Sequence, residues 1–444
     1  MKPLIGALLL LTVAGGAGAQ QGSGIFPFSY RLVELDNGFK AYLIKAGAPG
    51  QITYLSVVRT GSRDEVEPGK SGFAHFFEHM MFRGTEKYPN YDSVTAAIGA
   101  ARNANTSNDR TAYYIVAASE YLGQIVDLES DRFMNLKYPE ADFKTEAGAV
   151  LGEYQQGALS PGRFLDEKVR ETAFDRHTYR HTTIGFEPDV RAMPEGYQYS
   201  LDFFRRFYRP ENVVLILTGD FDENAAEALI REHYSDWKPG YEAPNIPVEP
   251  VQRAPRRRVV QYPGRTLPVL SVNYKSPAWS ATDRDAVALE VLGEVAFGSN
   301  SDIYKRLVIE QRRVQYLRGD FGLSRDPGLV SVNAMVVRPD DVAGIEGEIQ
   351  ETIDRFKREL VDTQSLHDTK SNLKYGFLMG LETSQNVAFS LIPFVVDTGG
   401  IEAVDEYYRT MESITPEDLR AAAQKFLVDT GKTVVTMVQA GGAR

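Results

Sequence analysis

The sequence predicts an α+β fold made of two homologous α/β sandwich domains, each with an antiparallel-rich sheet covered by helices. Three observations support this prediction. The chain of 444 residues is long for one hydrophobic core and comfortable for two. Between Trp237 and Arg258 it carries five prolines and little periodicity, which indicates an extended connector. A helix, a turn and a closing strand come at the end of each half, which suggests a duplicated domain.

Each half is expected to begin with β-strands and to continue with helices, because the hydrophobic period changes in that order. In the first half the expected elements are strands at 38–44, 52–60 and 213–217 and a helix at 199–208. In the second half they are strands at 258–261, 269–274 and 433–438, helices at 285–297 and 342–359, and a helix from Pro416 to about Leu427 with Thr415 as its cap.

The domain boundaries follow from these patterns. We expect a signal peptide at 1–19, an N-terminal domain at 20–237, a linker at 238–257 and a C-terminal domain at 258–444. The one dense basic cluster, Arg253 with Arg256, Arg257 and Arg258, is interpreted as a solvated end of the linker.

The first residues have the composition of a cleavable signal. Lys2 precedes an apolar run at 5–13, and small residues at 17–19 precede Gln20. No later segment approaches eighteen uninterrupted apolar residues, so no membrane span is expected. The chain has no cysteine, which excludes lipidation at cysteine and disulfides. A periplasmic or secreted location is therefore expected, and any metal site must use histidine and carboxylate ligands.

The charge balance excludes one class of partner. A formal net charge of −11 and a pI near 5.3 argue against nucleic acid as the main partner.

The most specific motif is His75-x-x-Glu78-His79, which uses two of the six histidines. On a helix these three side chains share one face, because residues three and four apart are neighbours. Two imidazoles one turn apart can hold one metal ion, and the carboxylate can reach a metal-bound water. The pattern is the inverse of the hydrolytic His-Glu-x-x-His zinc motif. The alternative is an amphipathic helix whose histidines are packed or exposed.

A catalytic zinc takes three protein ligands and keeps one position for water. The acidic segment that starts at Pro139 offers Glu146 and Glu153, two helical turns apart at the border of its apolar stripe. From the spacing alone, an exposed pair of surface glutamates is an equal alternative. A second histidine pair, His177 and His181, has no carboxylate between its members and is interpreted as part of a structural loop.

Further residues match a known pattern across the mature chain. They are the run from Phe77 to Thr85, Asn103 to Thr106, Asp109, Thr111, Tyr113 and Tyr114, the pair Glu146 and Glu153, Arg209 to Asn212, and Thr218 to Asp220. On these residues the chain resembles the pitrilysin or insulinase family of inverzincin metallopeptidases, and within it the short secreted bacterial members similar to mitochondrial processing peptidase. The resemblance implies two homologous domains that enclose a chamber, with zinc on the inner wall of the first.

The resemblance also implies residue roles. His75, His79 and Glu153 would be the ligands of one Zn²⁺ per chain, and Glu78 the general base that activates a zinc-bound water. Glu146 would support the metal helix and the ligands. Asn103 and Ala104 would lie on an edge strand to which a substrate peptide adds by main-chain hydrogen bonds.

The chain departs from the family at one position. Active members carry an Arg in the second domain, followed seven residues later by a Tyr, and both bind substrate. Tyr316 fits this pattern, but Ile309 stands where the Arg is expected, and a hydrophobic side chain cannot donate hydrogen bonds. Either Arg312 or Arg313 of the same segment compensates, or a partner subunit supplies the missing group. We therefore expect a dimer, and favour a heterodimer with a paralogue that carries the Arg and Tyr pair over a homodimer.

Two functions follow from these observations. The first is a secreted or periplasmic zinc endopeptidase that acts on peptides or unfolded segments. The alternative is a non-catalytic or weakly active subunit, retained for assembly or peptide binding in a heterodimeric peptidase.

Overall fold

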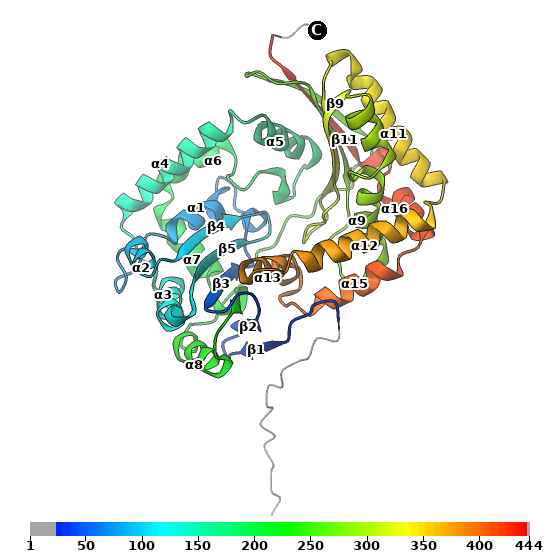
Figure 1. Cartoon of the computed structure of the whole chain (residues 1–444). Coiled ribbons are helices and arrows are strands. Elements are labelled where there is room, and N and C mark those ends of the chain that lie inside the picture. The colour runs from blue at the N-terminus through cyan, green and yellow to red at the C-terminus, as the bar shows by residue number, and fades with distance from the viewer. Residues whose placement is uncertain (1–23, 442–444) are drawn as a thin grey trace, which may run out of the picture.

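The computed structural model describes residues 24–441, and its fold is built on two separate sheets (Figure 1). The first sheet holds β1 (Tyr30–Glu34), β2 (Lys40–Lys45), β3 (Gln51–Val58), β4 (Ala101–Thr106), β5 (Thr111–Ala118) and β6 (Val213–Gly219). The second holds β7 (Arg256–Tyr262), β8 (Val269–Lys275), β9 (Val314–Asp320), β10 (Leu329–Val336) and β11 (Lys432–Gln439).

The two sheets have the same topology apart from β1. Their strand orders are β1-β2-β6-β3-β5-β4 and β7-β11-β8-β10-β9. Each contains one parallel pair, β2 with β6 and β7 with β11, and the other pairs are antiparallel. Each sheet ends in a strand that has one neighbour, β4 in the first and β9 in the second. The prediction of two homologous α+β halves with antiparallel-rich sheets is confirmed.

Helices follow the strands in each half. Those of the first half are α1 (Phe73–Met80), α2 (Tyr91–Ala97), α3 (Leu122–Asn135), α4 (Glu140–Gly157), α5 (Pro161–Ala173), α6 (Glu187–Ala192), α7 (Tyr197–Phe207) and α8 (Glu223–Tyr234). Those of the second half are α9 (Arg284–Phe297), α10 (Asp302–Tyr304), α11 (Val342–Arg358), α12 (Thr363–Met379), α13 (Ser384–Ser390), α14 (Ile392–Thr398), α15 (Ala403–Ser413) and α16 (Pro416–Phe426).

Each sheet is covered partly by a helix from the opposite half. Helix α13 contacts β3 and β6 of the first sheet, and α5 contacts β7 and β11 of the second (Figure 1). The apolar side chains under α5 form a separate core, with Leu165 and Val169 against Val260, Val435 and Met437. This exchange of helices means that neither half buries its sheet alone.

The interpretation of the basic cluster as a solvated linker end fits Arg253, which is exposed in the connector, and is wrong for the three arginines that follow. Arg256, Arg257 and Arg258 belong to strand β7, and each pairs with a carboxylate. Arg256 and Arg258 pair with Asp175 and Glu171, so they join the two halves at α5. Sequence composition gave no sign of these partners, because both acids lie in the other half.

The predicted signal peptide at 1–19 lies outside the described residues. Within residues 24–441, no single helix has the length and apolarity to cross a bilayer. One pair of segments, Ser384–Thr398 and Ala403–Ser413, is long and apolar enough when taken together, but the two are bent by 89° relative to each other.

Candidate metal centre

The His75 motif lies on helix α1, whose first turn is fixed by a buried carboxylate. Gly72 precedes the helix with a φ of +95°, a left-handed conformation that favours glycine. The Glu65 carboxylate accepts hydrogen bonds from the N–H groups of Gly72, at 2.7 Å, and Ala74, at 2.6 Å. It therefore satisfies amide groups that the helix itself leaves unpaired.

The two faces of α1 have different chemistry. Phe73, Phe76, Phe77 and Met80 are fully buried in the core of the first half. His75, Glu78 and His79 are partly exposed on the opposite side. The alternation of aromatic and polar positions in the motif thus anchors the helix on one side and presents three polar side chains on the other.

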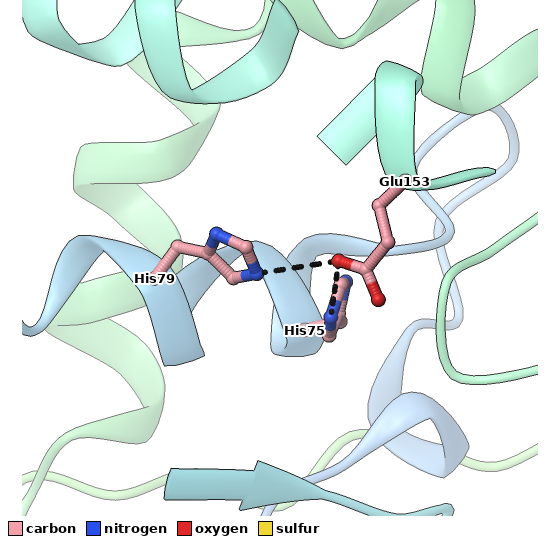
Figure 2. Close-up of side chains that lie close together, drawn as sticks. All are labelled: His75, His79 and Glu153. Atoms are coloured by element: carbon pink, nitrogen blue, oxygen red, sulfur yellow. Dashed lines mark ion pairs between the residues drawn. The ribbon is translucent and has the colours of Figure 1, made fainter. Parts of the chain in front are cut away.

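Glu153, on α4, faces the two histidines (Figure 2). Its Oε2 lies 3.5 Å from His75 Nε2 and 3.6 Å from His79 Nε2. One ligand atom from each of the three residues lies within 4.8 Å of the others. Two nitrogens and one oxygen from elements some seventy positions apart therefore converge on one point.

These separations suit a zinc ion better than direct hydrogen bonds. Both N–O distances exceed the roughly 2.7–3.2 Å of a good hydrogen bond. Ligands placed tetrahedrally at about 2.0–2.2 Å from zinc lie roughly 3.3–3.6 Å from one another. Burial lowers the pKa of His75 to about 4, so its imidazole is neutral at pH 7 and keeps a lone pair for a metal. The residues fit the ion that the sequence implied.

Glu146, one of the two predicted glutamates of α4, contacts the far side of His79. Its Oε2 lies 3.2 Å from His79 Nδ1, and its Oε1 accepts a hydrogen bond from Arg83. In the tautomer whose Nδ1 carries the proton, His79 donates to Glu146 and its Nε2 lone pair faces Glu153. This is the carboxylate–histidine arrangement that orients metal ligands.

Glu78 lies beside the metal group and is held by one hydroxyl. Thr106 Oγ1, at the end of edge strand β4, donates to Glu78 Oε2 at 2.6 Å. Burial raises the pKa of Glu78 above its ordinary value, while the Thr106 hydrogen bond opposes the rise. A carboxylate with a raised pKa in a cavity is suited to accept and return a proton.

A cavity of about 650 Å³ opens beside these groups. Its lining includes His75, Glu78 and Glu153, and every lining residue belongs to the first half, between positions 75 and 187. The cavity is large enough for several side chains of a peptide.

The predicted substrate-binding residues occupy different places. Asn103 and Ala104 lie on edge strand β4, where the Asn103 side chain accepts the Ala104 N–H at 2.9 Å. Tyr316 lies on β9 of the second sheet and is 39% exposed. Ile309 is 58% exposed and belongs to a π-helical segment, Lys305–Glu310. Neither Tyr316 nor Ile309 lines the cavity of the metal group.

Of the second histidine pair, only His177 has a polar contact with the second half among the described residues. His177 Nε2 lies 3.0 Å from Asp326 Oδ2 of the second half, and Tyr179 N–H donates to His177 Nδ1. His181 is buried, and burial lowers its pKa to about 4. Within the described residues, only His75, His79 and Glu153 form a group of ligands close enough to share one ion.

The sequence reasoning missed the residues that hold the end of α1. Tyr113 Oη donates to the carbonyl of Phe77 at 3.1 Å, and buried Arg132 donates to the carbonyl of Met81 at 3.3 Å. Arg132 also pairs with Glu129 at 2.6 Å. Fully buried charged residues are rare, so Glu129 and Arg132, three apart on α3, were the one available signal.

Comparison with known proteins gives consistent matches over both halves. Residues 49–186 match the family description "Insulinase (Peptidase family M16)", and residues 197–373 match "Peptidase M16 inactive domain". The chain is 26% identical to the zinc protease PqqE of Helicobacter pylori over 98% of both chains.

Solved structures agree with this match. The crystal structure of a protease from Helicobacter pylori aligns with a TM-score of 0.85 and 26% identity, and covers 92% of this chain and 99% of that chain. The periplasmic protease PqqL of Escherichia coli aligns with a TM-score of 0.73 over 95% of this chain and 48% of that chain. At 18% identity, the likeness to PqqL shows the fold alone.

The duplicated fold and the histidine–glutamate group together define a protein of the zinc-protease type. More narrowly, the chain belongs to the insulinase family, peptidase family M16.

Proposed function

We propose that this chain is a zinc-dependent endopeptidase of the periplasm or the extracellular space, which hydrolyses peptides or unfolded segments. The observation that carries the proposal is the convergence of His75, His79 and Glu153 beside Glu78 in one cavity. Residues 1–19 would be removed as a signal peptide. One zinc per chain would be held by the three ligands, with Glu146 orienting His79.

A bound zinc ion would polarise the scissile carbonyl and make water more acidic. Glu78 accepts the proton of the attacking water, whose oxygen forms a bond with the carbonyl carbon. Glu78 then returns that proton to the amide nitrogen as the carbon–nitrogen bond breaks. Thr106 orients the carboxylate during both transfers through its 2.6 Å hydrogen bond.

The substrate would be held in an extended form on strand β4. The support for this position is that β4 pairs only with β5, which leaves its other edge open for main-chain hydrogen bonds. A peptide there would displace the Asn103 side chain from the Ala104 N–H. Tyr316 would approach from the second half or from a partner subunit.

The test is a comparison of wild type with Glu78→Gln. The variant is expected to keep one zinc per chain by elemental mass spectrometry and to lose on the order of 10²–10⁴-fold in kcat, since the proton acceptor is gone. Glu140→Gln, on the exposed start of α4, is the matched control and is expected to leave kcat unchanged. An equally active Glu78→Gln protein would contradict the assigned base.

A second candidate function is a binding or assembly subunit of a heterodimeric peptidase. The observation that favours it is the exposed Ile309 at a place where the resemblance expects a hydrogen-bonding Arg. We propose that the chain works as a dimer, and that a paralogue with the Arg and Tyr pair supplies the missing group. Full activity of the purified monomer would rule out this requirement, and inactivity with or without such a paralogue would favour the binding subunit.

A further inference from the structure

One cation of the cavity wall has no strong partner. Arg163, in the first turn of α5, lines the same cavity as His75, Glu78 and Glu153. Its Nη1 lies 3.6 Å from Glu153 Oε1, and its side chain is 60% exposed. This contact is too long for a good hydrogen bond, and exposed ion pairs of this kind contribute little free energy.

The other charged side chains of that wall are paired. Beyond the metal group and Glu78, each acidic lining residue has its own cation: Asp166 with Arg170 at 2.9 Å, Glu167 with Lys168 at 2.6 Å, and Glu187 with Arg191 at 2.5 Å. Lys168, the second lining cation, also contacts Glu171 at 2.9 Å. Among the cations that line this wall, Arg163 is therefore the one whose only ion pair within the described residues is with a predicted metal ligand, Glu153.

The structure places this guanidinium across the end of α4. Phe164, its neighbour, packs edge-on against Tyr262 of the second half, with ring centroids 5.5 Å apart. Gly157, at the end of α4, leaves room for the Arg163 side chain. A Cβ at this position would lie 2.9 Å from Arg163 Nη1 and 3.2 Å from its Cδ. Arg163 thus lies across the end of α4 on a helix that is docked against the second sheet.

A metal ion bound by Glu153 would weaken the one ion pair of Arg163. The carboxylate of Glu153 faces the imidazoles through Oε2 and Arg163 through Oε1. When Glu153 ligates a cation, its negative charge is shared with that cation, and its attraction for Arg163 falls. A planar guanidinium with five donors then faces the cavity with no other anion within ion-pair distance among the described residues.

We propose that Arg163 binds a carboxylate of the substrate, so that the cavity selects peptides with an acidic group close to the scissile bond. Carboxylate is the anionic group that a peptide carries, and a guanidinium binds it strongly because two parallel hydrogen bonds reinforce the charge attraction. The inference rests on the proposed metal role of His75, His79 and Glu153 and names the substrate class of that site.

The kinetic test uses synthetic decapeptides that differ only in Glu, Gln or Lys at each position around one cleavage site. Each peptide is made with a free and with an amidated C-terminus. For wild type, kcat/KM is expected to be about tenfold higher for the Glu peptide than for the Gln peptide. A factor of this size is expected from one added charge-assisted hydrogen bond at a partly exposed site. A Glu preference in the amidated series assigns the carboxylate to a side chain. Faster cleavage of the peptide with a free C-terminus in the Gln series assigns the bound carboxylate to the end of the substrate chain.

Substitutions then identify the residue responsible. Arg163→Met is expected to remove the preference, Arg163→Lys to restore part of it, and Arg163→Glu to reverse it in favour of Lys. Gly157→Ala keeps the arginine but displaces it, and is expected to weaken the preference. The control is Arg205→Met. The Arg205 side chain is 59% exposed on α7, and its substitution is expected to leave the peptide preference unchanged.

Binding gives a readout that is independent of turnover. On zinc-loaded Glu78→Gln protein, the acidic peptide is expected to bind about tenfold more tightly than its Gln counterpart, and adding Arg163→Met is expected to abolish the difference. A wild type that cleaves both peptides equally, or a preference that survives in Arg163→Met, overturns the inference alone. A wild type that binds no zinc overturns both this inference and the proposed function.

Discussion

Helices α1 and α9 occupy the same place in the two halves, since each follows the central strand β3 or β8 and precedes the edge strand β4 or β9. Their surroundings are opposite. Helix α1 buries one aromatic face and presents His75, Glu78 and His79 to a cavity. Helix α9 is buried on nearly all sides, with Val287, Leu289 and Leu292 among its fully buried residues.

The difference shows that the same position in the fold can hold either a helix with a functional polar face or a helix that only packs. A helix that leaves a polar face open loses apolar contacts on that side, and α1 replaces them with polar groups at its two ends. These are Glu65 at its start and Tyr113 and Arg132 at its finish. Helix α9 has no such face, so its stability comes from packing. The following predictions test this contrast.

Arg132→Met is expected to lower the free energy of unfolding by about 3–5 kcal/mol, because it leaves Glu129 buried without its cation. Both side chains of this pair are 1% exposed. Urea unfolding followed by circular dichroism measures the change. A loss below about 1 kcal/mol, similar to an exposed pair, would show that α1 does not depend on polar support.

Leu292→Ala, in the fully packed helix α9, is expected to cost roughly 2–5 kcal/mol, since it leaves a cavity in the core of the second half. The zinc affinity is expected to stay unchanged, as measured by competition with a chelating dye. Leu292→Met, which nearly conserves volume, is the control, with a cost under about 1.5 kcal/mol. Weaker zinc binding in Leu292→Ala would mean that the two halves are not separable.

Glu146→Gln is expected to weaken zinc binding by about 10–100-fold, because the amide holds the His79 ring less well than the carboxylate. The free energy of unfolding of the metal-free protein is expected to change little. The same dye competition measures the affinity, with Glu140→Gln of the same helix as control. Unchanged zinc affinity would remove Glu146 from the support of the site.

Glu290→Gln tests the one carboxyl in the middle of α9, and its effect is expected to be confined to the pH dependence of stability. Burial raises the pKa of Glu290 to about 7, against the opposing hydrogen bonds from Leu323 and Tyr407. Between the ordinary carboxyl value and pH 7, the unfolded chain has lost this proton and the folded chain keeps it. The folded state then binds more protons, so the free energy of unfolding of wild type falls as pH rises through this window.

Glu290→Gln removes this fall. The variant is therefore expected to gain on wild type between about pH 4.5 and 7, by about 3 kcal/mol at most, and the gain levels off above pH 7. Thermal unfolding at several pH values measures it. A difference that is the same at pH 4 and pH 8 would contradict the raised pKa.

Much of the fold was predictable, because local signals and tertiary packing agree in this chain. The expected strand at 269–274 is β8 (Val269–Lys275), and the helix expected from Pro416 is α16 (Pro416–Phe426), with Thr415 capping it as predicted. These elements have clear periodicity and strong start or stop residues. The exchange of α5 and α13 between the halves was not predictable, since it depends on contacts between distant segments.

The candidate site was predictable in part for the same reason. The spacing of His75, Glu78 and His79 is local, so the motif could be recognised. For Glu146 and Glu153, spacing alone left a role in the metal site and an exposed surface pair as equal alternatives, and the resemblance favoured the first. Glu65 and Arg163 gave no usable pattern, and the spacing of Arg132 from Glu129 did not point to α1. Each acts through a partner that is distant in sequence or on another element, which composition and periodicity do not reveal.

The most direct test of the central claim is anomalous diffraction at the zinc absorption edge from crystals of the zinc-loaded protein. The account predicts one peak per chain, among His75 Nε2, His79 Nε2 and Glu153 Oε2, and none in crystals of His79→Ala. A peak at another place, such as the His177 and His181 region, or no peak in the wild-type protein, would contradict it.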